Sequence, residues 1–203
     1  MVFKSRNLNA LENVLNVSSL PRHSLGGSLF KTDEAKTFFA EWRDLHSKEC
    51  VPHFRTLFSK LSSTILPHLV ILEQGEGGAY VLRYVGTKRV DLWGKEPTNS
   101  DGMTMVSQRT ADAFRRNVET LSEHPCALHA INDTLSPQDG RFQSERILIP
   151  VKTDLAAPRR VASFNAKFGV PEYVLGGTAQ VDPTSHTWID IGFGVPAEPT
   201  EEG

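Results

Sequence analysis

The sequence predicts an α+β fold, a five-stranded antiparallel sheet with flanking helices and an N-terminal helical extension. Between Pro67 and Asp101, a continuous apolar segment (Leu69–Leu72), a glycine turn and an alternating segment (Tyr80–Val85) form a hairpin pattern that runs directly into a short helix, Thr87–Gly94. A longer helix and three strand-like segments follow. This order is typical of a small sheet with helices over one face.

The first helix is predicted from Asp33 to Glu49. Thr32 is a suitable N-cap, and Asp33 and Glu34 favour the positive end of the helix. Apolar residues recur at helical spacing and form one face: Ala35, Phe38, Phe39, Trp42 and Leu45. These aromatic residues offer more apolar surface than a small sheet edge requires. Phe38, Phe39, Trp42 and Leu45 are therefore the predicted dimerisation surface.

The remaining elements follow from the same periodicities. Apolar residues at helical spacing run from Phe54 to Ile65. A longer helix is predicted from Ser107 to Glu123, and His124-Pro125 ends it. Strands are predicted at Cys126–Leu135, Arg141–Lys152 and Arg159–Phe168, because their residues alternate and turns rich in Pro, Asp and Gly separate them.

The chain divides into an N-terminal arm (1–31), a domain that includes the first helices (32–168) and a C-terminal extension (169–203). The extension contains one more strand-like segment, His186–Phe193, which is expected to pair with a sheet edge or with a partner chain. Its last residues are rich in Pro, Glu and Gly, so disorder is expected there.

Composition argues against several classes of protein. The 203 residues are 39% hydrophobic and 23% charged, with a formal net charge of −2, so nucleic acid is not the expected partner. The two cysteines, Cys50 and Cys126, are too few for a disulfide framework. No segment is long and apolar enough for a membrane span, and the cytoplasm is the expected location. Scattered basic pairs such as Lys88-Arg89 are expected on a solvated surface.

Sequence motifs for catalysis are absent, and no catalytic residues are predicted. There is no phosphate-binding loop and no nucleophile elbow. Ser163, His129 and Asp133 could be drawn as a triad, but spacing alone gives no geometry. The chain is therefore not expected to be an enzyme.

Two groups have spacing that could suit a metal: His46, Cys50 and His53, and His124, Cys126 and His129. Pro52 breaks the helix that would align the first group. In an extended strand, Cys126 and His129 point to opposite faces. No metal site is therefore predicted.

A specific family resemblance rests on the segment LRYVGTKRVDLWGKEPT. Its characteristic positions are an arginine, an aliphatic residue, Gly-Thr, an aromatic-Gly pair and a later Thr, here Arg83, Val85, Gly86, Thr87, Trp93, Gly94 and Thr98. The segment resembles the PAS-like family found mainly in alphaproteobacteria, and the resemblance covers residues 32–168. The chain departs from the family pattern at Asn99-Ser100-Asp101, where a glycine is common, and at Tyr84, where an aliphatic residue is commoner.

The resemblance implies a sheet facing helices across a core that either is filled or opens as a ligand pocket. The candidate pocket residues are Leu82, Arg83, Tyr84, Trp93, Phe114, His129, Ala130, Arg146, Leu148, Ser163 and Phe164. The alternative is that the apolar members only pack the core, and that Arg83 pairs with Glu145 or Asp91 at the surface. No cofactor is predicted, because neither cysteine lies in the motif that flavin attachment requires. An unidentified small molecule is a possible ligand.

The function implied is a stand-alone sensory or regulatory domain in bacterial signal transduction. It would act through a small ligand, through contact with a partner protein, or as a homodimer. A protein-interaction scaffold with a filled core is an alternative, as is a small enzyme on a related α+β fold such as a cone-shaped isomerase-like barrel. The inward face of the central strands distinguishes the scaffold from the enzyme. The interior is polar if Ser163 and Asn165 point inward, and apolar if Ala162 and Phe164 do.

Overall fold

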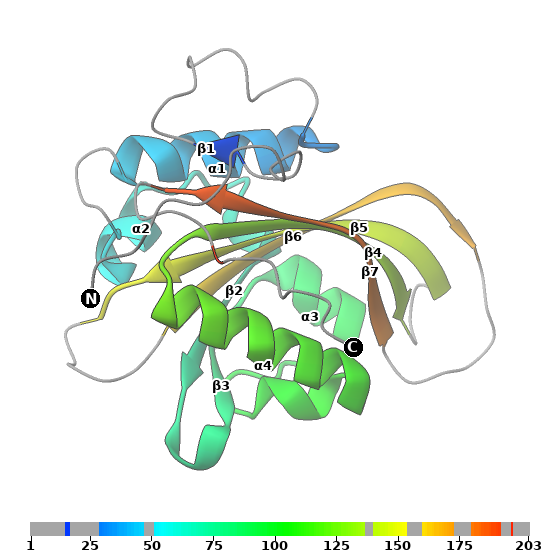
Figure 1. Cartoon of the computed structure of the whole chain (residues 1–203). Helices are drawn as coiled ribbons and strands as arrows, with labels where there is room; N and C mark the ends of the chain where they lie inside the picture. The colour runs from blue at the N-terminus through cyan, green and yellow to red at the C-terminus, as the bar shows by residue number, and fades with distance from the viewer. Residues whose placement is uncertain are drawn as a thin grey trace, which may run out of the picture.

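The sheet has the strand order β1-β7-β4-β5-β6-β2-β3 (Figure 1). The structure is a computed structural model that describes residues 15–16, 29–46, 51–136, 140–153, 160–172, 180–191 and 196. The strands are β1 (Leu15–Asn16), β2 (Leu69–Gln74), β3 (Tyr80–Val85), β4 (Ala127–Ser136), β5 (Gly140–Val151), β6 (Arg160–Glu172) and β7 (Gln180–Asp190).

The helices are α1 (Asp33–His46), α2 (Phe54–Lys60), α3 (Thr87–Trp93) and α4 (Gln108–Glu123). Short 3-10 turns lie at η2 (Leu66–His68), η3 (Glu76–Gly78) and η4 (Gly102–Met105). The first helix is therefore described to His46 rather than to the predicted Glu49, and residues 47–50 lie outside the described part of the chain.

The five predicted strands are present and antiparallel, and the α+β prediction is confirmed. The predicted number of strands is too low, because β7 pairs antiparallel with β4 as a further long strand. The strand-like segment of the C-terminal extension thus joins the sheet edge, although β7 begins at Gln180 rather than His186. The two-residue β1 pairs parallel with β7. Apart from β1, the N-terminal arm before Leu29 lies outside the described residues, as do the last seven residues.

Helices cover both faces of the sheet, not one as predicted. In Figure 1, α1 and α2 lie on one side of the sheet and α3 and α4 on the other. Alternate residues of β2 enter two separate cores: Leu69 and Ile71 face α1, whereas Val70 and Leu72 face α4. The continuous apolar segment Leu69–Leu72 is explained by this burial on both faces.

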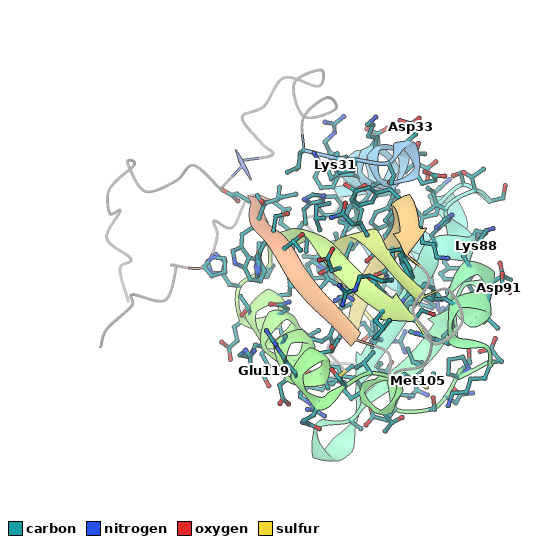
Figure 2. All side chains as sticks on the ribbon, turned by 90° about the vertical axis from the view of Figure 1, so that its right-hand side faces the viewer. Lys31, Asp33, Lys88, Asp91, Met105 and Glu119 are labelled. Carbon is teal, nitrogen blue, oxygen red and sulfur yellow. The ribbon has the colours of Figure 1, made fainter. Side chains whose placement is uncertain are left out.

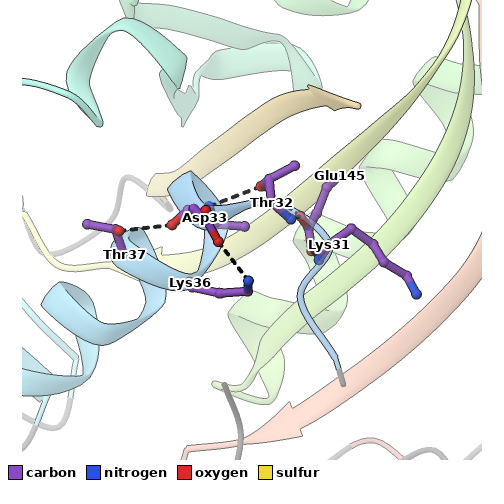
Figure 3. A network of polar contacts seen from close by, with 7 residues as sticks. Lys31, Thr32, Asp33, Lys36, Thr37 and Glu145 are labelled. Carbon is purple, nitrogen blue, oxygen red and sulfur yellow. Dashed lines mark hydrogen bonds and ion pairs between the residues drawn. The ribbon is translucent and has the colours of Figure 1, made fainter. Parts of the chain in front are cut away.

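A buried carboxylate fixes the start of α1. Glu145 of β5 is fully buried and accepts four hydrogen bonds, two from the amides of Lys31 (2.9 Å) and Thr32 (2.7 Å), and two from Thr32 Oγ1 (2.8 Å) and His129 Nε2 (2.7 Å). Thr32 Oγ1 also accepts from the Ala35 amide at 3.1 Å, which confirms Thr32 as the N-cap. Figure 3 shows Lys31, Thr32 and Glu145 gathered at this helix start.

The aromatic face of α1 packs on the sheet of its own chain. Phe38 stacks on Phe164 with ring centroids 5.0 Å apart, and Phe39 and Trp42 are in contact at 5.3 Å. Both partners of each pair are buried, and so is Leu45. A dimer built on these four predicted residues would require α1 to leave the sheet.

A β-bulge in β3 changes which side chains share a face. Ile71 pairs with Tyr84 but Leu72 pairs with Leu82, so Arg83 has no partner across the ladder. The expected alternation of Tyr80, Leu82 and Tyr84 therefore breaks. Tyr80 and Leu82 face α4, whereas Tyr84 faces the other side, where its ring meets Phe58 edge-on at 4.6 Å.

The family motif has a physical basis at Gly86, which precedes α3. A Cβ at this position would lie 2.3 Å from the Pro67 carbonyl oxygen, so only glycine lets the two backbone segments approach. The departure at Asn99 is compatible with the same fold. Asn99 has φ +69°, the left-handed conformation that glycine favours and asparagine tolerates, and its amide donates to Leu82 O at 2.7 Å.

We predict that Glu145→Gln lowers the free energy of unfolding by about 2–4 kcal/mol at neutral pH, because an amide cannot accept from all four donors. Burial opposes ionisation of Glu145, yet the hydrogen bonds from His129, Lys31 and Thr32 lower its pKa below the ordinary value. The ionised form therefore adds stability that is present above the ordinary glutamate pKa, about 4.3, and is lost as the pH falls further.

Urea denaturation of the wild type and the variant across this pH range measures the effect. The difference between them should shrink below about pH 4.3. Glu119→Gln, at an exposed position of α4, is the control and should show no such difference. Equal stability of Glu145→Gln and wild type at neutral pH would contradict the structural role given to this carboxylate.

We also predict that Gly86→Ala lowers the free energy of unfolding by at least about 2 kcal/mol, since the backbone of Leu66, Pro67 or α3 must move. Gly75→Ala is the matched control. Its Cβ would meet Val81 at an ordinary 3.4 Å, so a change within about 1 kcal/mol is expected. Thermal unfolding of both variants tests the pair, and equal losses would show that the close approach at Gly86 is unimportant.

Candidate functional site

A cavity of about 60 Å³ lies between the sheet and the helices α3, η4 and α4. One part of its wall is apolar and comes from the hairpin, η4 and α4: Val70, Leu72, Leu82, Met103 and Phe114. Polar residues of β4, β5, β6 and α3 also line it: Thr134, Ser136, Arg146, Ser163, Asn165 and Arg89. The core between the sheet and α4 is thus incompletely filled, and its cavity has both apolar and cationic lining residues.

The register of β5 and β6 places the polar side chains together. Arg146 and Asn165 are direct cross-strand partners, and Arg146 Nε donates to Asn165 Oδ1 at 3.2 Å. Asn165 Nδ2 in turn donates to Ser163 Oγ at 2.9 Å. The alternation of β6 sends Ala162 and Phe164 toward α1, so Ser163 and Asn165 face the cavity. The interior on this side is polar.

Arg89 enters the same cavity from α3. Its side chain lies over the ring of Trp93, one turn later, with the guanidinium carbon 5.0 Å from the ring centroid. Its Nε is buried and has no hydrogen-bond partner among the described residues. A buried polar atom without a partner is uncommon, because its desolvation is not compensated.

The two guanidinium groups lie close enough to repel one another. Burial and, as the smaller cause, the charge of Arg146 lower the pKa of Arg89 to about 9. Burial lowers the pKa of Arg146 to about 10. Within the described part of the chain, the ion pairs use other arginines: Arg83 and Arg160 pair with Glu73, and Arg115 pairs with Asp112. Arg89 and Arg146 are therefore two desolvated cations that have no carboxylate partner among the residues that the structure describes.

Two hollows adjoin the cavity. A groove of about 360 Å³ shares Arg89, Leu92 and Asn165 with it and includes Lys88 and Lys167. Figure 2 shows Lys88 and Asp91 of α3 pointing outward beside this groove. A second hollow of about 230 Å³, between α4 and the β4–β7 edge, shares Thr110, Phe114 and Arg146. Both arginines thus connect the cavity to more open space.

The structure brings five of the eleven candidate pocket residues to this cavity: Leu82, Trp93, Phe114, Arg146 and Ser163. Leu148 packs in the core on the same side but does not line the cavity, and Ala130 lines the second hollow. Arg83, Tyr84, His129 and Phe164 lie elsewhere. The bulge turns Tyr84 away and exposes Arg83, which pairs with Glu73 at 2.9 Å rather than with Glu145 or Asp91. His129 and Phe164 face α1.

Sequence reasoning missed Arg89 and gave Asn165 no site role. The sequence predicts a solvated surface position for both Lys88 and Arg89. In the structure Lys88 is exposed, whereas the Arg89 side chain is half-buried. Helical spacing could have identified Arg89, because it lies three residues before Leu92, the buried residue of α3.

Among the described residues, neither the catalytic triad nor the metal-binding groups considered in the sequence analysis come together in space. His129 faces α1 and Ser163 faces the cavity, so the sheet separates them. Cys126 lies in the core on the α4 side, where burial, with a smaller contribution from Asp190, raises its pKa to about 12. The described residues contain no cluster of potential metal ligands, and Cys50 with the His46 side chain falls outside them.

The described helices include none that is both long and apolar enough to cross a bilayer. Comparison with curated proteins gives no match. Comparison with protein families gives a match to the PAS domain over residues 30–164, which extends from just before α1 into β6 and includes both arginines of the cavity. The match covers more than half of the chain and agrees with the sheet and its inserted helices, so the chain belongs to the PAS domain family.

Proposed function

We propose that this PAS domain is a sensory or regulatory module of bacterial signal transduction that binds a small molecule in the cavity between its sheet and α3–α4. The observation that supports this most strongly is the pair of desolvated arginines in an unfilled cavity. A core selected only for stability would have apolar residues here, because a partly buried cation without a counter-charge is destabilising. A bound ligand would compensate the charges of these two side chains.

The output that we propose is a change in how α1 is held. Glu145 and Arg146 are consecutive in β5 and point to opposite faces of the sheet, one to the start of α1 and the other to the cavity. A shift of this strand segment that accommodates a ligand at Arg146 also moves the carboxylate that holds Lys31 and Thr32. The ligand would thus favour one packing of α1, and a partner protein or a second copy of the chain would contact the altered surface.

Hydrogen exchange of Arg146→Gln tests the coupling without a ligand. The substitution removes the cation from the cavity side of β5 and weakens its contact with Asn165. We predict faster exchange at the amides of Lys31 and Thr32, on the opposite face of the sheet, while α4 keeps its protection. Mass spectrometry of peptides from residues 29–46 gives the readout.

Arg141→Gln is the control, since Arg141 lies on the same strand but is exposed and lines neither the cavity nor its two adjoining hollows. It should leave exchange at Lys31 and Thr32 unchanged. The proposed transmission through β5 is wrong if folded Arg146→Gln protein also exchanges there at the wild-type rate.

A further inference from the structure

We propose that the ligand of the cavity is a compact organic anion, whose carboxylate or phosphate group is held jointly by Arg89 and Arg146 and whose short apolar remainder lies against Leu72, Leu82 and Met103. This inference rests on the proposed function and names the chemistry of its ligand. It depends on the charge, the hydrogen-bonding capacity and the size of one site.

The charge requires an anion. Two guanidinium groups face one small space, and in the described part of the chain neither is paired with a carboxylate. Each is already over an aromatic ring, Arg89 over Trp93 and Arg146 over Phe114 at 5.9 Å, which orients the cation but leaves its charge unneutralised. An anion between them would remove their repulsion and supply the missing counter-charge.

Hydrogen bonding favours an oxyanion. Among the described residues, Arg89 Nε is a buried donor without a partner, and Arg146 donates a hydrogen bond only through its Nε, to Asn165. A guanidinium group offers several donors in a planar fork that fits the oxygens of carboxylate or phosphate. Asn165 accepts from Arg146 and donates to Ser163, so this hydrogen-bond chain holds Arg146 in position.

The size of the cavity limits the remainder of the ligand. About 60 Å³ is far below the roughly 300–1,000 Å³ of typical pockets for drug-sized ligands and cofactors, which favours a compact ligand. The apolar lining residues are mostly aliphatic and include Leu72, Leu82 and Met103, which suits a few methylene groups. The adjoining groove, where the cations Lys88, Arg89 and Lys167 outnumber the carboxylates Glu34 and Asp91, gives an anion a route inward.

Thermal unfolding with a graded set of probes tests this inference. Sodium acetate, butyrate, hexanoate and inorganic phosphate are compared at equal ionic strength, with sodium chloride as the reference and butyramide as the neutral counterpart of butyrate. A ligand at about 100 times its Kd should raise the Tm of a chain of this size by roughly 5–10 °C. The inference requires a rise with butyrate or phosphate and none with butyramide.

The same series of probes distinguishes a ligand with a carboxylate group from a ligand with a phosphate group. A rise with butyrate that exceeds those with acetate and phosphate assigns a short carboxylic acid. A rise with phosphate alone assigns a phosphate group as the part that is recognised. Either result supports the inference.

The variants Arg89→Gln and Arg146→Gln link the effect to the site. Each should weaken binding of the active probe by about 10-fold or more, measured by calorimetry, because a charge-assisted contact is lost. Without probe, each variant should be as stable as wild type or more stable, since an unpaired cation has been removed. A purely structural role would instead lower the Tm of the free protein.

Arg146→Lys keeps the charge but not the fork, so it is the fallback if Arg146→Gln does not fold, and it should bind the probe more weakly than wild type. Arg141→Gln should bind as wild type does. Three results would overturn the inference: no response to any anion, an equal response to butyramide and butyrate, or an anion response that both arginine variants retain. An equal response to butyramide would leave the proposed sensory function standing with a neutral ligand, while failure of the α1 exchange test would reject the coupling alone.

Discussion

Two consecutive charged residues at the centre of the sheet determine much of this structure. β5 is the middle strand, and its Glu145 and Arg146 point to opposite faces. Glu145 is buried and accepts hydrogen bonds from four donors, so its charge is compensated and it fixes the start of α1. Arg146 is desolvated and has no carboxylate partner among the described residues. The fold therefore compensates the buried charge of Glu145, whereas the described part of the chain supplies no counter-charge to Arg146 or Arg89.

The elements with strong local signals could be predicted from the sequence. The hairpin, the helix Gln108–Glu123 and the three later strands follow from periodicity and turn residues, and Thr32 from capping chemistry. Five of the eleven candidate pocket residues line the cavity, and they followed from the family resemblance, because PAS domains share the arrangement of sheet and inserted helices. These predictions concern which residues are buried and in which element they lie.

The face that each residue occupies could not be predicted equally well. One extra residue at Arg83 moves Tyr84 to the α1 side, and alternation contains no sign of it. Alternation in β6 separates Ser163 from Phe164 but does not say which of them meets the cavity. Arg89 was missed because a basic pair on a short helix is usually solvated, and its burial arises only when α3 packs beside Arg146. Similarly, the aromatic spacing in α1 predicts an apolar face that must be buried, but it does not predict that the sheet of the same chain buries this face.

The energy of that packing limits what a small ligand can do. Burying Phe38, Phe39, Trp42 and Leu45 contributes about 6–12 kcal/mol at roughly 1.5–3 kcal/mol for each side chain. A ligand at about 100 times its Kd supplies only about 2.7 kcal/mol, and it can shift an equilibrium by no more than its preference for one state. Complete release of α1 is therefore out of reach. A change confined to the first turn of α1 requires less free energy, because only a few hydrogen bonds to Glu145 hold that turn. The exposed residues beside it, Asp33, Glu34 and Thr37, are polar. Any partner that responds to the cavity would then recognise a polar helix end, rather than the buried aromatic face.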